Sequence, residues 1–398
     1  MTRTDTAQRP GPLLGSRRLR GVDAARGLAL LGMMATHLLD RSLSDGTANP
    51  AFALADGRAS ATFALLAGAG LALADGATDG PRTSLGHAWA RTAVRAVLVL
   101  VVGLTLASLG PPVAVILQYY AVLFVLVVPF VRLPAAVLAL GGGLWLLLAP
   151  VASQWLRLTF GLDGPGPQVG LERLLVQPVA SLQDLLLTGY YPVLTWFGYL
   201  LLGAAVGRLP LRRTATALGL VGSGLLLAAG SWLVSWALLS TAAAQRALAG
   251  GDPLSGRGVE GPFFGTTPTS SWWWLAIRTP HSGAPLDLLG TAGVALAVVG
   301  ACLLVARGPA GAVLLPLAAA GSMTLTLYSA HVVAVWAGQP GLTDPGDWIV
   351  HSLVALVVAW VWRMRFRRGP LEEGVAQVVD AVAGPVPPRE QALAPGTR

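Results

Sequence analysis

Residues 22–39 read VDAARGLALLGMMATHLL, an apolar run long enough to cross a lipid bilayer as a helix. Three ionisable side chains, Asp23, Arg26 and His37, fall within this run. An ionisable group at membrane depth costs free energy unless it is paired or faces water, so such groups usually serve a function. Asp23, Arg26 and His37 are therefore the first candidates for a functional site.

The rest of the chain repeats this apolar pattern. Of its 398 residues, 54% are hydrophobic and only 12% are charged. We predict an all-α fold, a polytopic integral membrane helical bundle of about ten transmembrane helices (range nine to eleven), as a multi-pass protein of the cell (plasma) membrane. The predicted spans are residues 22–39, 59–75, 91–109, 113–131, 133–150, 189–208, 214–239, 286–306, 312–336 and 347–364.

The placement of arginine predicts the orientation. All 27 basic residues are arginine; they gather beside alternate ends of the predicted spans, and others are scattered in the longer outer loops, where charge has less effect on topology. The positive-inside rule then places both termini in the cytoplasm. Topology thus explains the net charge of +8, and we expect no nucleic-acid partner because no basic stripe is interleaved with stacking aromatics. The single cysteine, Cys302, excludes an intramolecular disulfide and a cysteine-based metal cluster, and we expect no metal.

The predicted outer side collects the unusual polar residues. Transfer of an acyl group needs a proton acceptor and a stabiliser for the developing oxyanion. His37 or His331 could supply the first, and Asp40 could orient the His37 ring if the helix continues that far. Arg58, Gln118 or a tyrosine hydroxyl could supply the second. Further candidates on this side are Tyr119, Tyr190, Tyr191, Trp196, Tyr328 and His281.

Structural roles for the same residues stay open from sequence alone. An intramembrane histidine can simply hydrogen-bond between helices, and tyrosines and tryptophans commonly form an interfacial belt. Asp23 and Arg26 are three residues apart, so they either neutralise each other or help to bind an anionic cofactor from the cytoplasm.

Six short motifs carry a resemblance to a known family. They are VDAARG (22–27) at the start of the span that contains His37, GRASATFA (57–64), QYYAVLF (118–124), GYYPVLTW (189–196), MTLTLYSAH (323–331) and GPLE (369–372). Together they resemble the bacterial branch of the membrane acyltransferases related to heparan-alpha-glucosaminide N-acetyltransferase.

The resemblance implies a helical bundle that takes an acetyl group from cytoplasmic acetyl-CoA, or another acyl-CoA, and transfers it to a sugar on the far side. Residues 17–373 are then the transmembrane acyltransferase-like domain, preceded by a disordered cytoplasmic tail (1–16) and followed by a short surface helix and a disordered cytoplasmic tail (374–398). This sequence differs from the family pattern at the expected catalytic histidine. The lysosomal enzyme is understood to use a lumenal histidine after its first core span, whereas residues 40–57 contain none here, so His37 is a displaced candidate.

The leading hypothesis is an acyl-CoA-dependent O- or N-acyltransferase acting on an extracytoplasmic glycan, lipid-linked sugar or small molecule. Asp23, Arg26, Arg91 and Arg95 would bind the coenzyme, and His37, Arg58, Tyr191 and His331 would line one outer chamber. The lipid bilayer and the acceptor are the expected partners, and a second copy of the chain in a homo-oligomer is a further candidate. The alternative is a transporter or permease for a polar or anionic solute. A non-catalytic scaffold, with its polar residues dispersed in space, is the third reading.

Overall fold

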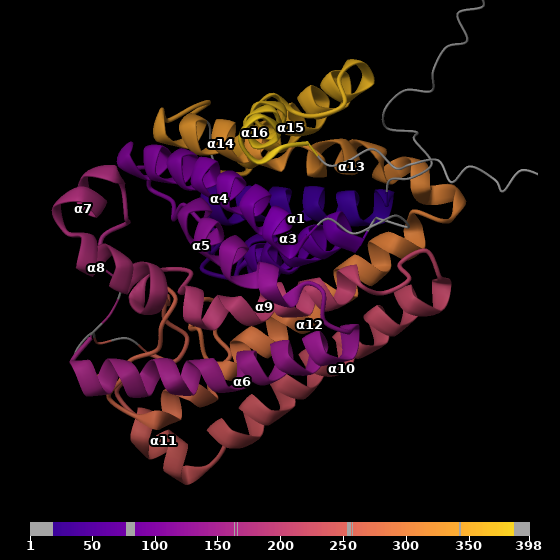
Figure 1. Ribbon diagram of the computed structural model, residues 1–398. Helices are drawn as coiled ribbons and strands as arrows, with labels where there is room; N and C mark the ends of the chain where they lie inside the picture. The colour runs from indigo at the N-terminus through magenta and orange to yellow at the C-terminus, as the bar shows by residue number, and fades with distance from the viewer. Residues whose placement is uncertain are drawn as a thin grey trace, which may run out of the picture.

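The fold is helical throughout the part of the chain that the structure describes. In this computed structural model these are residues 19–76, 84–162, 164, 166–252, 256, 258–341 and 344–385. Among them no β-strand occurs, and the one isolated bridge joins Ser42 and Ala48 (Figure 1). The predicted all-α class is confirmed for these residues. The predicted disordered tails at both ends of the chain lie outside them.

The helices follow one another with short connections, except for two longer loop regions around residues 161–192 and 240–284. The helices are α1 (Arg20–Leu38), α2 (Pro50–Ala55), α3 (Arg58–Gly76), α4 (Leu85–Ser108), α5 (Leu117–Val127), α6 (Ala135–Phe160), α7 (Leu171–Val176), α8 (Pro178–Gln183), α9 (Val193–Gly207), α10 (Thr214–Leu239), α11 (Ala242–Leu248), α12 (Pro285–Val305), α13 (Leu315–Gly321), α14 (Thr324–Trp336), α15 (Asp344–Arg365) and α16 (Pro370–Ala383). Single 3-10 or π turns cover Val128–Phe130, Asp184–Thr188, Trp272–Ala276 and Pro309–Leu314.

Each predicted span coincides with at least one of these helices. By length and apolar composition, six helices of the described residues can cross a membrane, and eight spans result if two bent helix pairs each count as one. The chain is therefore a multi-pass helical membrane protein. The count of ten spans and the cytoplasmic position of both termini stay predictions.

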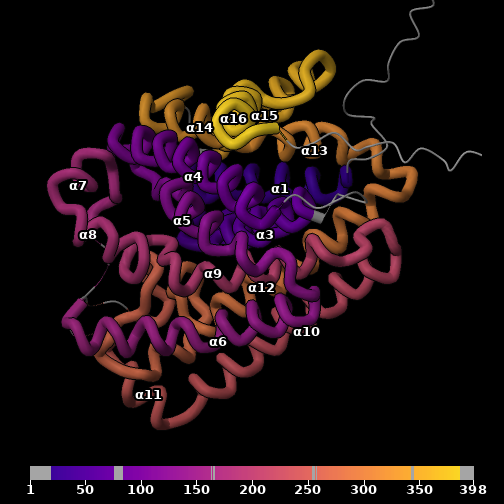
Figure 2. Tube along the Cα trace, viewed as in Figure 1, coloured from indigo at the N-terminus to yellow at the C-terminus, as the bar shows by residue number. Residues whose placement is uncertain are grey.

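The helices form three groups that Figures 1 and 2 show from the same side. Helices α14, α15 and α16 lie together along one edge, α1, α3, α4 and α5 occupy the middle, and α6, α9, α10 and α12 lie on the opposite side. The closest packing joins α10 to α12, α3 and α6 to α9, and α1 to α13. Most of the buried apolar side chains belong to one continuous core that runs through these groups.

Glycines let α1 lie at the centre of the molecule. A side chain at Gly27 would collide with the main-chain oxygen of Leu317, and one at Gly321 would collide with that of Asp23. Close backbone contact through small residues is the usual way in which membrane helices associate. Helix α1 is consequently enclosed by α3, α12 and α13, and Asp23 is buried within protein.

The segment predicted as one span over residues 312–336 is not a single straight helix. The chain forms two helices there, α13 and α14, which are bent by 70° at the break that contains Ser322 and Met323. The break is tolerated because the amides that it frees are satisfied. The Glu372 carboxylate of α16 accepts hydrogen bonds from the backbone N–H groups of Leu325 (2.7 Å) and Thr326 (3.2 Å).

The surface helix predicted after the last span is present as α16, and it packs against other helices of the bundle. It packs on α4, where the Asp380 carboxylate lies 2.6 Å from Arg91 Nη2, and it also contacts α14. The expected boundary between residues 373 and 374 falls inside this helix, so α16 belongs in space to the helical bundle.

Candidate active site

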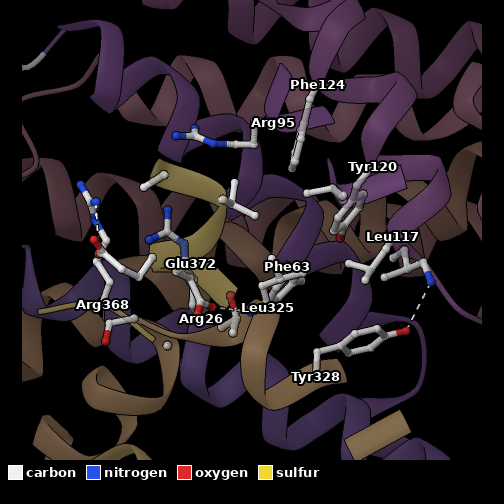
Figure 3. A pocket seen from close by; sticks show the side chains of 18 of the residues that line it. Arg26, Phe63, Arg95, Leu117, Tyr120, Phe124, Leu325, Tyr328, Arg368 and Glu372 are labelled. Atoms are coloured by element: carbon white, nitrogen blue, oxygen red, sulfur yellow. Dashed lines mark hydrogen bonds and ion pairs between the residues drawn. The ribbon is translucent and has the colours of Figure 1, made fainter. Parts of the chain in front are cut away.

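A cavity of about 980 Å³ opens between α1, α3, α4, α5 and the group formed by α14, α15 and α16 (Figure 3). Its size is at the upper end of the range of about 300–1,000 Å³ that is usual for small-molecule sites. Residues distant in sequence build it, because Arg26 comes from α1, Tyr120 from α5, Tyr328 from α14 and Glu372 from α16.

Charged and aromatic groups separate along this cavity. Figure 3 shows Arg26, Arg368 and Glu372 toward one end and Tyr120 and Tyr328 toward the other, with further apolar side chains between them. Five arginines and two glutamates line the whole cavity, an excess of three positive charges: Arg26, Arg95, Arg363, Arg367, Arg368, Glu372 and Glu373. Guanidinium groups match the geometry of phosphate oxygens, so the charged end suits a phosphorylated ligand.

Arg26 is held in place from two sides. Its Nη1 lies 3.3 Å from the Asp23 carboxylate, and its Nη2 donates to the Leu66 carbonyl oxygen at 3.2 Å. Gly70 provides the room, because a Cβ atom there would lie 2.6 Å from Arg26 Nη2. The pairing with Asp23 and a place in the cavity, which were alternatives for Arg26 in the sequence, therefore occur together.

Arg91 and Arg95, the other two arginines predicted to bind the cofactor, have different surroundings. Arg95 lines the cavity, whereas Arg91, one turn earlier on α4, does not. Arg91 instead donates to the Asp380 carboxylate and to the Gly384 carbonyl oxygen, and so fastens α16 to α4. Sequence could not foresee this, because the partner lies almost 300 positions further along the chain.

Three histidines form a hydrogen-bonded row, which we call the histidine chain: His37, His331 and His351. His37 Nδ1 lies 3.0 Å from His331 Nε2, and His331 Nδ1 lies 2.7 Å from His351 Nδ1. The row ends at a main-chain oxygen, since His351 Nε2 donates to the Gln339 carbonyl at 2.8 Å. The two predicted catalytic histidines are thus brought together across α1 and α14.

The third predicted catalytic residue, Asp40, is placed differently from the expectation. Helix α1 ends at Leu38 and Leu39 is extended, so Asp40 does not continue the helical face of His37 and is exposed. The carboxylate that does meet a histidine is that of Asp56, which lies 3.4 Å from His281 Nε2 and 3.6 Å from Arg41.

His281 joins four of the other predicted residues in what we call the aromatic cluster: Tyr119, Tyr190, Tyr191, Trp196 and His281. The ring centroids of His281 and Tyr190 are 4.8 Å apart, and so are those of Tyr191 and Trp196. The Tyr119 hydroxyl accepts a hydrogen bond from the Tyr190 backbone N–H at 3.2 Å. A space of about 10 Å³ adjoins Trp196 and His281 of this cluster; it is water-sized and too small for a sugar in this conformation.

Arg58 and Gln118, two further predicted binding residues, belong neither to the histidine chain nor to the aromatic cluster. Arg58 lines a separate hollow of about 290 Å³ beside Trp232, Glu260 and Arg278. Gln118 is fully buried and its amide has no hydrogen-bond partner among the described residues. Tyr328, by contrast, lines the large cavity, and its hydroxyl accepts from the Ile116 backbone N–H at 3.3 Å.

One shared outer chamber for His37, Arg58, Tyr191 and His331 is therefore not what the structure shows. The cavity, the histidine chain, the aromatic cluster and the Arg58 hollow are four separate places, and none of those four residues lines the large cavity. The cavity and the histidine chain are nevertheless linked, because Tyr328 and His331 are one turn apart on α14 and Arg26 and His37 share α1.

Sequence reasoning missed several members of these groups. Arg363, Arg367 and Arg368 indicated only topology, yet they line the cavity together with residues of α16. Glu372 was noted only as part of a motif, and His351 only as a residue at the end of a span. The available signal was their clustering near the final span, but no local pattern showed which element they would face.

The fold and the cavity together define a multi-pass helical membrane protein with a large cavity that is lined by five arginines. Comparison with protein families places it further. Residues 18–239 match the family model described as heparan-alpha-glucosaminide N-acetyltransferase, catalytic, over more than half of the chain. The chain belongs to this family of membrane N-acetyltransferases, whose acetyl donor is acetyl-CoA. The comparison with curated proteins gave no match. His331, His351 and α16 lie beyond the matched residues.

Proposed function

We propose that the protein transfers an acetyl group from cytoplasmic acetyl-CoA to an amino group of an extracytoplasmic sugar or glycan, in the plasma membrane. The observation that carries this proposal is the cavity with an arginine-rich end and an aromatic end. Acetyl-CoA has the same division, because its nucleotide end carries three phosphate groups and its thioester end is uncharged.

The donor is proposed to lie with its phosphates at Arg26, Arg95 and Arg368 and its thioester arm toward Tyr120 and Tyr328. The arginine-rich end is the cytoplasmic one in the predicted orientation, which matches the source of acetyl-CoA. The reaction breaks the thioester C–S bond, forms a C–N bond to the sugar amine, and moves one amine proton to the departing thiolate. Such a transfer requires a base, and His37 is the proposed one.

Acceptor recognition is proposed to involve the aromatic cluster and the Asp56–His281 pair. Sugars stack on aromatic rings and hydrogen-bond to carboxylate and imidazole groups. Because the space beside the cluster is too small for a sugar here, acceptor binding would require the loop that carries His281 to move. His281 has a φ of +60°, an uncommon conformation for a residue other than glycine and one that is frequent at functional sites.

Donor binding tests the proposal directly. We expect purified protein in nanodiscs to bind acetyl-CoA, and Arg95→Gln to weaken that binding by about tenfold to a hundredfold, because one charged hydrogen bond is worth about 1.5–3 kcal/mol. Arg91→Gln is the comparison variant, one turn away on the same helix; because Arg91 does not line the cavity and its partner Asp380 is partly exposed, the Kd should change less than in Arg95→Gln. Isothermal titration measures both. Equal effects of the two variants would contradict the proposed donor position.

A transporter is the second candidate, and one observation favours it. Two helix pairs are broken, by 51° between α8 with its following π turn and α9, and by 70° between α13 and α14. Discontinuous helices often surround the solute site of a carrier. Proteoliposomes with radiolabelled D-glucosamine outside and acetyl-CoA inside separate the two functions. We expect N-acetylglucosamine to form; uptake of unmodified glucosamine would favour the carrier.

A further inference from the structure

The histidine chain contains two members that lie outside the family match and that the proposed function does not use, His331 of α14 and His351 of α15. We propose that His351 is a positioning residue that fixes the tautomers of His331 and His37, so that His37 Nε2 is left as the proton acceptor. This inference rests on the proposed function for the role of His37, but the tautomers themselves follow from the hydrogen bonds.

The donor and acceptor roles along the histidine chain are set at the end where His351 meets the Gln339 carbonyl oxygen. A carbonyl oxygen can only accept, so the contact of 2.8 Å to Gln339 requires a proton on His351 Nε2. In a neutral imidazole the other nitrogen is then an acceptor, so His351 Nδ1 must accept from His331 Nδ1–H at 2.7 Å. His331 Nε2 in turn accepts from His37 Nδ1–H at 3.0 Å.

The outcome is a single free acceptor site. His37 Nε2 keeps its lone pair and has no hydrogen-bond partner among the described residues, while His37 is only partly buried. Burial supports the neutral state of the other two rings, because His331 is 3% and His351 9% exposed. No ion pair in the described part of the chain joins a carboxylate to any of the three histidines.

The same row can move a positive charge away from the reacting atoms. When His37 Nε2 takes the proton of the sugar amine, His37 Nδ1–H can pass to His331 Nε2, and His331 Nδ1–H can pass to His351 Nδ1. His351 is then a transient imidazolium, which its burial makes less stable than the neutral resting ring, and its Nε2–H still donates to the Gln339 carbonyl oxygen. The reverse shifts return one proton through His37 Nε2 to the departing thiolate, so protons and charge balance.

A metal ion is a poor alternative occupant of the three rings. Their nitrogens face one another in pairs along a row, whereas metal ligands converge on one point. Among the described residues, no group of three or more histidine, cysteine or acidic side chains is arranged to hold a metal.

Solid-state NMR of protein labelled with ¹⁵N-histidine, in nanodiscs and without substrate, tests the assignment. The five histidines of the chain are resolved by single substitutions. We expect Nδ1–H tautomers for His37 and His331 and an Nε2–H tautomer for His351. A wild-type spectrum with His37 as the Nε2–H tautomer, or with a charged His331, would overturn the proposal.

Two substitutions then separate positioning from packing. His351→Phe removes the acceptor for His331 Nδ1–H, and we expect mixed tautomers at His331 and His37 and a kcat for acetyl transfer to D-glucosamine lowered by about tenfold to a hundredfold. His351→Gln keeps an acceptor oxygen and a donor amide, so it should restore both the tautomers and most of kcat. The KM for acetyl-CoA should stay the same in both.

The outcomes also separate this inference from the proposed function. If the tautomers are as expected but the protein transfers no acetyl group, the proposed histidine chain is supported and the proposed acetyltransferase function is refuted. If His351→Phe does not fold, the wild-type and His351→Gln spectra decide. Unchanged His331 and His37 signals in a folded His351→Phe protein would reject the positioning role.

Discussion

At the scale of single residues, the aspartate that contacts a histidine is not the one that sequence spacing suggests. Asp40 is closer to His37 in sequence but is exposed and outside the helix. Asp56 is 5% exposed and bridges Arg41 and His281. The interaction of a carboxylate with a histidine depends on the distance between the two groups and not on their separation in sequence. The turn formed by α2 and the start of α3 brings Asp56 to His281.

Substitution of these aspartates should therefore have unequal effects. We expect Asp56→Asn to lower stability by about 1–3 kcal/mol, because it removes a buried charge that is paired with His281 and Arg41, and to raise the KM for a sugar acceptor. Asp40→Asn should change stability by less than about 0.5 kcal/mol, as exposed substitutions usually do. Thermal unfolding in detergent compares the two. A larger effect of Asp40→Asn would mean that the first helix extends further than the structure has it.

At the scale of elements, α16 stabilises the start of α14. Glu372 accepts from the backbone N–H groups of Leu325 and Thr326 and from the Thr326 hydroxyl, the last at 2.6 Å. A carboxylate at a helix N-terminus satisfies free amides and interacts favourably with the helix dipole. Because α14 carries Tyr328 and His331, this cap positions both the cavity and the histidine chain.

Removal of the cap should loosen α14. We expect Glu372→Ala to cost about 1–3 kcal/mol and to speed hydrogen exchange at the Leu325 and Thr326 amides. Glu373→Ala is the control, because its pair with Arg368 is about half exposed on both sides and is worth at most about 1 kcal/mol. Hydrogen–deuterium exchange mass spectrometry resolves the segment. Protection that persists in Glu372→Ala would show that α14 does not depend on this carboxylate.

At the scale of the whole molecule, the close packing of α1 on α13 keeps the site residues of α1 near those of α14, which follows α13. Gly321 permits this contact because any Cβ atom would overlap the Asp23 main-chain oxygen. We expect Gly321→Ala to destabilise the protein by about 1–3 kcal/mol, since α13 must move, and to weaken acetyl-CoA binding. The shift would also displace Arg26, which lies one turn beyond Asp23 on α1.

Gly143→Ala is the matched control for that change. It lies within α6 and no atom of a neighbouring element comes within 4 Å of a Cβ atom there. Alanine is favoured over glycine in a helix by up to about 1 kcal/mol, so this variant should be neutral or slightly more stable. Fluorescence-detected thermostability in detergent measures both proteins. A loss of stability in Gly143→Ala equal to that in Gly321→Ala would contradict the packing argument.

The sequence by itself determined the class of fold and the kinds of chemistry that are present. Apolar runs of membrane length must form helices because a bilayer offers no partner for unpaired backbone groups, so the helical segments could be predicted to within a few residues at many ends. Arg26, His37 and His331 were visible as candidates because ionisable groups within apolar segments are costly in a bilayer unless they are paired or face water.

Only the tertiary structure decided which of those groups meet. Arg95 reaches the cavity and Arg91 does not, His331 contacts His37 and Asp40 does not, and Glu372 caps a helix break that hydropathy could not reveal. Each choice depends on helix rotation, on a bend of 70° and on glycine contacts between elements. Hydropathy shows which segments can lie in the membrane, but the neighbour that each face of a helix meets is set by packing between segments far apart in the chain.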